Sequence, residues 1–121
     1  MEFLLDSVIL IDHLNNMIQA TEWIDQFHEK SCISFITRAE ILTGIPESAV
    51  KEIKLFLDGF INLPLHAHDA DLAAILRRKY RWKLPDAIQA ALAINHNLIL
   101  VTRNTKDFSP KQHDFVQIPY K

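Results

Sequence analysis

The stretch Leu84–Phe108, which reads LPDAIQAALAINHNLILVTRNTKDF, decides the fold of this chain. Its first part, Asp86–Asn95, predicts a helix that is apolar almost all round and is therefore buried. Leu98–Val101 follows as a short apolar strand, and a polar turn that contains Asp107 comes next. A buried helix that leads into a buried strand is typical of the middle of a parallel-sheet domain.

Short strands and helices also alternate along the rest of the chain. Apolar runs predict five strands, at Phe3–Leu5, Cys32–Phe35, Phe60–Leu63, Leu98–Val101 and Phe115–Ile118. Helical spacing predicts further helices at Ser7–Asn15, at Met17–Lys30, from Thr37, from Pro46 and at Ala70–Arg81. This alternation indicates an α/β fold with a central, mainly parallel five-stranded sheet flanked by helices.

Length and composition fit one globular domain over residues 1–121. The chain is 49% hydrophobic and 23% charged, and its formal net charge of -2 does not by itself indicate a nucleic-acid binder. Its single cysteine cannot form an internal disulfide, which fits a reducing compartment. The first apolar run is interrupted by Asp6 and Asp12 and has no basic leader. We therefore expect neither a signal peptide nor a membrane span, and a cytoplasmic protein.

Four acidic residues lie at the boundaries of the predicted elements. Asp6 and Asp107 follow strands, and Glu40 lies in the helix after the second strand. Asp86 begins the buried helix of the opening stretch. Because ligands bind at the carboxyl ends of parallel strands, these carboxylates can meet at one edge of the sheet. Such a cluster predicts a site for a hard divalent cation such as Mg²⁺ or Mn²⁺.

Each acid also has a purely structural explanation. Asp6 is a favoured residue for capping the helix that follows it. Thr37 and Glu40 have the spacing of a helix capping box. Asp86 suits the dipole of the helix that it begins, and Asp107 can cap a short turn. Taken singly, these structural roles are favoured; only the set of four favours a metal site.

A basic segment lies directly before Asp86. Its cations are Arg77, Arg78, Lys79, Arg81 and Lys83, and the aromatic residues Tyr80 and Trp82 stand between them. Cations bind phosphates and aromatic rings stack on unpaired bases, whereas a solvated helix end with buried aromatics is the structural alternative. Beside an acidic cluster, the segment favours a nucleic-acid substrate. Arg38 and Arg103 lie next to the other acids and are further candidates for phosphate contacts.

The remaining polar residues favour structural roles. His66 and His68 have no cysteine or third histidine at zinc-ligand spacing, so we expect them in a loop or on the surface. Three further acids are expected on solvated helix faces: Asp12, Asp69 and Asp71.

Three stretches in order resemble the motifs of PIN-domain ribonucleases of the VapC toxin type. LLDSVILIDHL resembles the first motif, with an Asp at the end of the first strand, and SFITRAEILTGI resembles the second, with its Glu in a helix. The opening stretch resembles the third and fourth motifs run together. The resemblance covers nearly the whole chain, and it implies a three-layer PIN-like fold and a metal-dependent endoribonuclease.

The resemblance also implies which acids form the site. Asp6, Glu40 and Asp86 correspond to its acidic core, and Asp107 takes the fourth position. All four are then both catalytic residues and ligands of Mg²⁺ or Mn²⁺.

Three polar residues are expected to support these acids or to contact the substrate: Ser7, Thr102 and Asn104. Asn104 stands where some family members carry the fourth acid, so it is interpreted as a neutral ligand or a hydrogen-bond donor. Val8 stands where the family commonly has Asn, which removes one polar contact.

The resemblance implies three partners. The substrate is RNA, single-stranded or looped, with tRNA as one example. A cognate antitoxin protein is expected to block the site, and the toxin is expected to form a homodimer.

Two other functions remain open from the sequence. A phosphoacceptor receiver domain has a similar size and alternation, but it normally has an acidic pair after its first strand and an Asp after its third. Here Ser7 follows Asp6, and Pro64 and Leu65 follow the third strand. The other is a PIN domain with weak catalysis that acts as a protein-binding module, for which Asn104 is the only indication.

Overall fold

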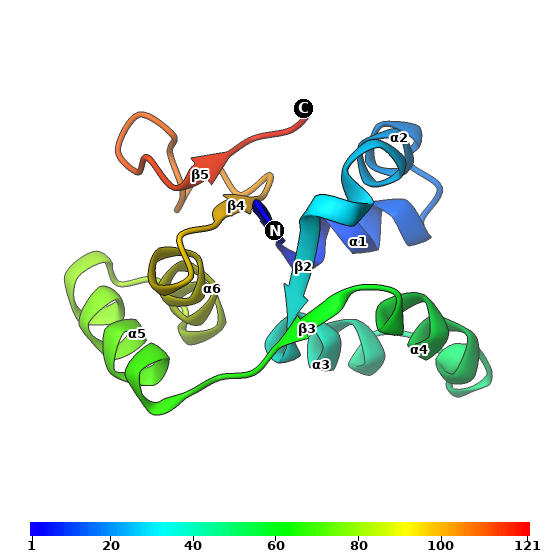
Figure 1. Ribbon diagram of the computed structural model, residues 1–121, viewed down its shortest axis with the longest axis horizontal. Coiled ribbons are helices and arrows are strands. Elements are labelled where there is room, and N and C mark those ends of the chain that lie inside the picture. The colour runs from blue at the N-terminus through cyan, green and yellow to red at the C-terminus, as the bar shows by residue number, and fades with distance from the viewer.

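The computed structural model describes residues 1–121 and forms one five-stranded sheet in which every pairing is parallel. The strands lie in the order β3-β2-β1-β4-β5 (Figure 1). Their bounds are β1 Phe3–Leu5, β2 Ser31–Ser34, β3 Ile61–Leu63, β4 Ile99–Val101 and β5 Val116–Gln117. The predicted five-stranded sheet is therefore confirmed, with each strand at or within two residues of its expected bounds.

Six α-helices and two short 3₁₀ helices connect the strands. The α-helices are α1 Ser7–Leu14, α2 Ile18–Phe27, α3 Phe35–Thr43, α4 Val50–Asp58, α5 Ala67–Tyr80 and α6 Leu84–Asn95. The 3₁₀ helices are η1 His28–Lys30 and η2 Glu47–Ala49. None of the helices is both long enough and apolar enough to cross a membrane.

Helix α3 begins earlier than the sequence predicts. Its cap is Ser34, whose Oγ accepts a hydrogen bond from the Thr37 backbone N–H at 3.1 Å. The predicted Thr37–Glu40 capping box is therefore wrong, because Thr37 already lies within the helix. Glu40 does not cap this helix, and its carboxylate remains free for another role.

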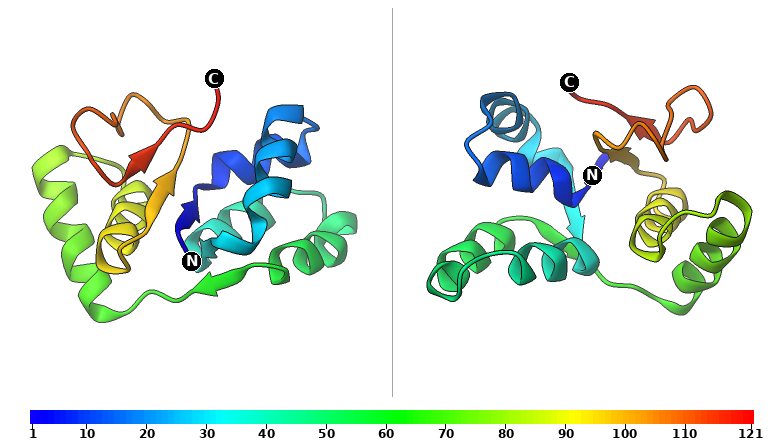
Figure 2. Two further views of the ribbon diagram at one scale, coloured as in Figure 1. Left: turned by 45° about the horizontal axis from the view of Figure 1, so that its top comes forward. Right: turned by 180° about the vertical axis from the view of Figure 1, so that it is seen from behind.

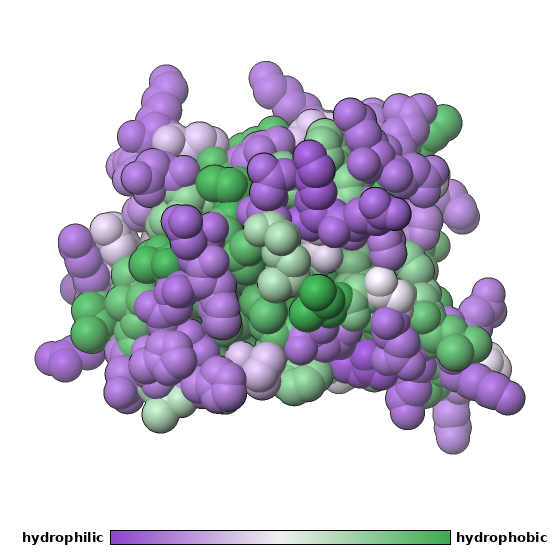
Figure 3. Space-filling view, in the orientation of Figure 1, coloured by the Kyte–Doolittle hydropathy of each residue, from purple (hydrophilic) through white to green (hydrophobic).

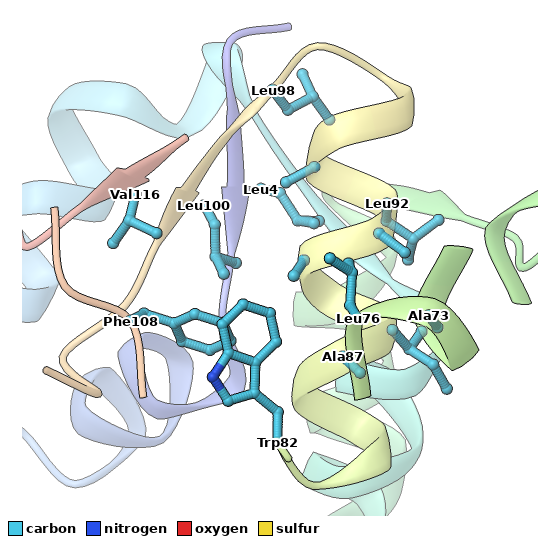
Figure 4. Packing of buried hydrophobic residues seen from close by; sticks show 14 of the residues in the cluster. Leu4, Ala73, Leu76, Trp82, Ala87, Leu92, Leu98, Leu100, Phe108 and Val116 are labelled. Atoms are coloured by element: carbon cyan, nitrogen blue, oxygen red, sulfur yellow. The ribbon is translucent and has the colours of Figure 1, made fainter. Parts of the chain in front are cut away.

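The sheet has a hydrophobic core on each face, which gives the domain three layers (Figure 2). Neighbouring residues of a strand point to opposite faces. Leu4 and Leu100 pack with α5 and α6 (Figure 4), whereas Leu5 and Val101 pack with residues of α1, α2, α3 and α4. The predicted three-layer α/β arrangement is confirmed.

The turn between α5 and α6 is held by aromatic packing. Helix α5 ends at Tyr80, and its C-cap, Arg81, has a left-handed backbone with φ 61°. Trp82 follows, and only 4% of it is exposed; it packs on Phe108 with ring centroids 4.8 Å apart (Figure 4). Tyr80 stacks on Trp82 at 4.5 Å. The basic segment is therefore attached to a rigid part of the core.

Large apolar side chains that remain exposed belong to different helices. Ile18 lies on α2, Leu55 on α4 and Ile75 on α5. On the face shown in Figure 3, hydrophilic side chains project around the periphery and apolar atoms show between them. Scattered exposure of this kind is usual for a folded protein and does not by itself mark a binding surface.

The order of the strands identifies the edge of the sheet beside β1 as a position for a ligand. The connections from β1 to β2 and β3 move in one direction across the sheet, whereas β4 and β5 lie on the other side of β1. Strand order therefore reverses between β1 and β4. In open parallel sheets this reversal leaves room for a ligand outside the carboxyl ends of the two strands.

Candidate active site

Asp6 lies at this reversal point, directly after β1. Its carboxylate caps α1 by accepting a hydrogen bond from the Ser7 backbone N–H at 2.9 Å. Its other oxygen accepts a bond from the Thr102 hydroxyl, which follows β4, at 2.7 Å. Only 8% of Asp6 is exposed. The capping role expected for Asp6 is present, and the same side chain also joins the ends of the two central strands.

The loop after β4 places Asp107. The Thr102 hydroxyl accepts a hydrogen bond from the Asn104 N–H at 3.0 Å. The Asn104 side chain in turn donates to the Asp107 carboxylate at 3.1 Å and accepts from the Asp107 N–H at 3.2 Å. A continuous set of hydrogen bonds thus runs from Asp6 to Asp107, and Asn104 fixes the orientation of the acid.

Glu40 and Asp86 approach the same place from two helices on opposite faces of the sheet. Glu40 lies on α3, and the Ser7 side chain is near enough to lower its pKa. Asp86 lies in the first turn of α6. The structure therefore brings the four sequence-predicted acids to one edge of the sheet, within electrostatic reach of one another.

The electrostatics of this edge favour a cation. The pKa of Asp86 is raised to about 6, mainly by burial and also by the charges of Asp6 and Asp107, while Lys83 acts in the opposite direction. Burial also raises the pKa of Glu40, and the charges of Asp6 and Asp86 add to this effect. Carboxylates that repel one another in a partly dry crevice lose this repulsion when a cation binds between them.

The donor groups fit a hard divalent ion. All four acids supply carboxylate oxygens, which Mg²⁺ and Mn²⁺ prefer. No three of the His, Cys, Asp and Glu side chains lie close enough together to enclose an ion by themselves.

Arg38 and Arg103 are bound to protein groups. The Arg38 guanidinium contacts Asp58 at 2.8 Å and Asn62 at 3.1 Å. Arg103 makes two hydrogen bonds to Asp12, at 2.6 Å and 2.9 Å. Both side chains thus stabilise contacts within the fold, although the sequence alone suggests phosphate contacts for them.

Asp12 corrects a sequence prediction. We expect it on a solvated helix face, but only 7% of it is exposed. The Tyr120 hydroxyl donates to its carboxylate at 2.9 Å, in addition to the two bonds from Arg103. A buried carboxylate needs such partners, and a single acid within the apolar run of α1 was the available signal.

Asp69 was also expected in solvent and is fully buried. Its carboxylate accepts hydrogen bonds from the His66 N–H at 3.0 Å and from the Asn95 side chain at 2.8 Å. It therefore closes the first turn of α5 and connects that helix to the end of α6. The expected exposure of His66 and His68 agrees with the structure.

The basic segment is ordered around the turn that leads to Asp86. Arg77 donates a hydrogen bond to the Trp82 carbonyl, and Trp82 lies in the core and is not free to stack on a base. The other four cations, Arg78, Lys79, Arg81 and Lys83, are exposed. The structural alternative is therefore correct for Trp82, while the exposed cations remain available to phosphates.

The fold and this edge together define a three-layer α/β domain with a cluster of carboxylates where the strand order reverses. The model of the PIN domain family matches residues 3–111 of the sequence. The chain therefore belongs to the PIN domain family, as the resemblance implies. No functionally curated protein matches the sequence significantly.

Solved structures agree with this assignment. A chain in a toxin-antitoxin complex from Klebsiella pneumoniae is 33% identical, with a TM-score of 0.91, and the match covers 99% of both chains. DNA-bound VapBC from Salmonella typhimurium matches at 22% identity and a TM-score of 0.78, over 89% of this chain and 90% of that one. VapBC2 from Rickettsia felis, bound to a promoter DNA fragment, matches at 21% identity and a TM-score of 0.79, over 97% of this chain and 98% of that one. The last two show the shared fold.

Proposed function

We propose that the protein is a Mg²⁺- or Mn²⁺-dependent endoribonuclease and the toxin of a toxin–antitoxin pair. The observation that carries this proposal is that Asp6, Glu40, Asp86 and Asp107 come from separate elements to the edge of the sheet where the strand order reverses. There the charge of Asp6 raises the pKa of both Glu40 and Asp86. A structural set of caps does not require such repulsion. The family match also leaves the receiver-like alternative without support.

The four acids would contribute unequally to binding the cation. Asp6 and Asp86 are the main ligands, because Asp6 is anchored at the end of β1 and Asp86 interacts with both Asp6 and Asp107. Glu40 and Asp107 complete the site directly or through water. When bound, the cation supplies a water of lowered pKa and neutralises charge on the phosphodiester.

Three neutral residues orient these ligands. The Thr102 hydroxyl donates a hydrogen bond to one oxygen of Asp6, and the Ser7 side chain lies near the Glu40 carboxylate and lowers its pKa. Asn104 makes two hydrogen bonds to Asp107, which fits a role as a donor that aligns the fourth acid. The side chains predicted to support the acids thus have contacts suited to that role.

The basic segment would guide RNA towards the acids. Lys83 is close enough to lower the pKa of Asp86, so phosphates bound along this segment would be led to the acidic edge. Arg78, Lys79 and Arg81 are exposed nearby in the sequence. Single-stranded or looped RNA, including tRNA, suits cations that hold a backbone while bases remain accessible.

A cognate antitoxin is the proposed protein partner. The similar structures from Klebsiella pneumoniae and Salmonella typhimurium are a toxin-antitoxin complex and a VapBC complex. In this chain, an apolar groove of about 180 Å³ contains Ile11, Leu14 and Ile41, and Glu40 lies on its wall. A partner that fills the groove through apolar contacts would reach the acids. We also propose a homodimer and a cytoplasmic location.

RNA cleavage tests the proposed activity directly. The wild type should cleave RNA with Mg²⁺ or Mn²⁺ and stop when EDTA is added, and Asp86→Asn should be inactive in every condition. Asp71→Asn, an exposed acid on α5, is the matched control and should retain full activity. Equal cleavage with and without EDTA would exclude the metal-dependent mechanism. No cleavage by the wild type in any condition would favour the protein-binding module.

A further inference from the structure

A buried hydrogen-bond network joins the two helices that carry Glu40 and Asp86. Gln89 of α6 is only 1% exposed. Its side-chain oxygen accepts a bond from the Ser34 hydroxyl at 2.6 Å, and its side-chain nitrogen donates to the Thr37 hydroxyl at 2.7 Å. These bonds cross from α6 to the first turn of α3 through the interior of the protein.

The network lies one helical turn from each of the two acids. Residues three positions apart in a helix share one face, so Thr37 stands next to Glu40 on α3 and Gln89 stands next to Asp86 on α6. Thr37 is itself fixed because its backbone N–H donates to Ser34 at the helix cap. A displacement of either helix would therefore move one carboxylate relative to the other.

The two acids need such a restraint because they repel each other. Glu40 on α3 and Asp86 on α6 carry like charges when both are ionised. Without a cation this repulsion favours separation of α3 and α6. Directional hydrogen bonds between fixed partners oppose that separation more specifically than apolar packing does.

Gln89 is the only polar residue among the buried residues of α6. Its neighbours in the sequence, Ile88 and Ala90, belong to a hydrophobic core cluster. An apolar side chain of similar size would fill the same volume, whereas a buried amide must find partners for its oxygen and nitrogen. The hydroxyls of Ser34, which caps α3, and of Thr37 supply these partners, and no buried side-chain polar atom lacks one.

We propose that Gln89 and Thr37 are positioning residues that fix the separation of Glu40 and Asp86 and thereby set the affinity of the metal site. This inference rests on the proposed metal-dependent function. Neither residue touches the cation or the RNA; each acts through the helix that carries an acid. A change in either residue should therefore appear in metal binding, even in the absence of substrate.

Calorimetric titration of the RNA-free protein with Mn²⁺ tests the proposal. Gln89→Leu and Thr37→Val should each weaken Mn²⁺ binding about tenfold, the lower end of the loss expected when groups behind metal ligands are removed. Thr37→Ser keeps the hydroxyl and should restore the wild-type affinity. The Thr37 pair keeps the test decisive if Gln89→Leu does not fold.

Asn95→Ala is the matched control for stability. It removes another hydrogen bond made by a side-chain amide of α6, the one that Asn95 donates to Asp69, at the end of the helix away from Asp86. The control should lower the melting temperature and leave Mn²⁺ affinity unchanged. If Mn²⁺ affinity fell with melting temperature in all variants, including Asn95→Ala, the positioning role would be wrong.

Two outcomes separate this inference from the proposed function. If the wild type binds Mn²⁺ and cleaves RNA, but Gln89→Leu and Thr37→Val bind Mn²⁺ equally well, only the positioning role is overturned. If the wild type itself does not bind Mn²⁺, the proposed metal-dependent function and the positioning role are overturned together.

Discussion

Asp6 and Asp12 are both buried at the two ends of α1, but their partners differ. Asp12 accepts two hydrogen bonds from Arg103 and one from Tyr120. Asp6 has only a backbone N–H and the Thr102 hydroxyl as donors. The same side chain at nearly the same exposure is therefore matched by a cation in one place and by neutral groups in the other.

The charges that surround a buried acid distinguish a structural role from the proposed functional one. A buried carboxylate with a guanidinium partner has its charge balanced within the protein, and removal of either partner leaves the other uncompensated. Asp6, in contrast, raises the pKa of both Glu40 and Asp86. Burial alone does not separate the two roles, whereas the sign of the neighbouring charges does.

The largest predicted effect is on the activity of Asp6→Asn. We expect RNA cleavage to fall by at least about a hundredfold, the upper range for the loss of groups that only support metal ligands. Thermal stability should be unchanged or higher, because one repelling charge disappears. Parallel measurement of cleavage rate and melting temperature checks both. A marked loss of stability together with unchanged cleavage would make Asp6 a structural acid like Asp12.

Asp12→Asn should show the opposite pattern. We expect a loss of about 2 kcal/mol in the free energy of unfolding, below the value for a fully buried pair because Arg103 is partly exposed. Urea unfolding measures the change. Asp58→Asn breaks the more exposed pair with Arg38 and should cost less than about 0.5 kcal/mol. Equal losses in the two variants would show that the Asp12 contact contributes no special stability.

The pH dependence of stability tests the acidic edge. The pKa of Asp86 is raised from 3.8 to about 6. The folded protein therefore binds this proton more tightly than the unfolded chain does, so the metal-free protein loses stability as pH rises between these two values. Cleavage requires the ionised acid and so should increase with pH, and because a bound cation favours the ionised form, this increase should lie below about 6 when Mg²⁺ is present.

Urea unfolding at several pH values, with EDTA present, measures this slope. Asp86→Asn should remove the contribution of this group, because an amide does not titrate in the range. A wild-type slope that persists unchanged in the variant would assign the pH dependence to other groups.

The smallest predicted effect concerns the basic segment. The double variant Arg78→Gln, Lys79→Gln should weaken RNA binding and reduce the slope of log affinity against log salt by about 0.7 for each lost phosphate contact. Fluorescence anisotropy with a labelled single strand measures it in an inactive Asp86→Asn background. Lys51→Gln, an exposed lysine of α4, is the control. The same slope in all variants would leave these cations as a solvated helix end.

The sequence was sufficient to predict the sheet because short apolar runs indicate buried strands. Neighbouring strand residues such as Leu4 and Leu5 enter opposite cores, so the central strands β1 and β4 read as continuous apolar runs. The end of each strand then located Asp6 and Thr102. Precise helix starts were less predictable: α3 begins at Phe35 because Ser34 supplies the cap.

Contacts between distant segments could not be predicted. Asp12 binds Arg103 and Tyr120, which lie 91 and 108 positions away, and the sequence does not show that these segments return to α1. Gln89 likewise lies within the helix that the sequence predicts to be buried and apolar almost all round. A lone amide in such a helix indicates burial with hydrogen bonds, but only the fold identifies Ser34 and Thr37 as its partners.

The backbone of Arg81 has a consequence for how this protein can change. A left-handed conformation at a helix end suits glycine, and an arginine there costs about 1–2 kcal/mol. Replacement by glycine would relax the backbone and remove a positive charge from the basic segment. This one substitution would thus raise the stability of the fold and weaken the attraction for the proposed RNA substrate, so selection for either property works against the other at this position.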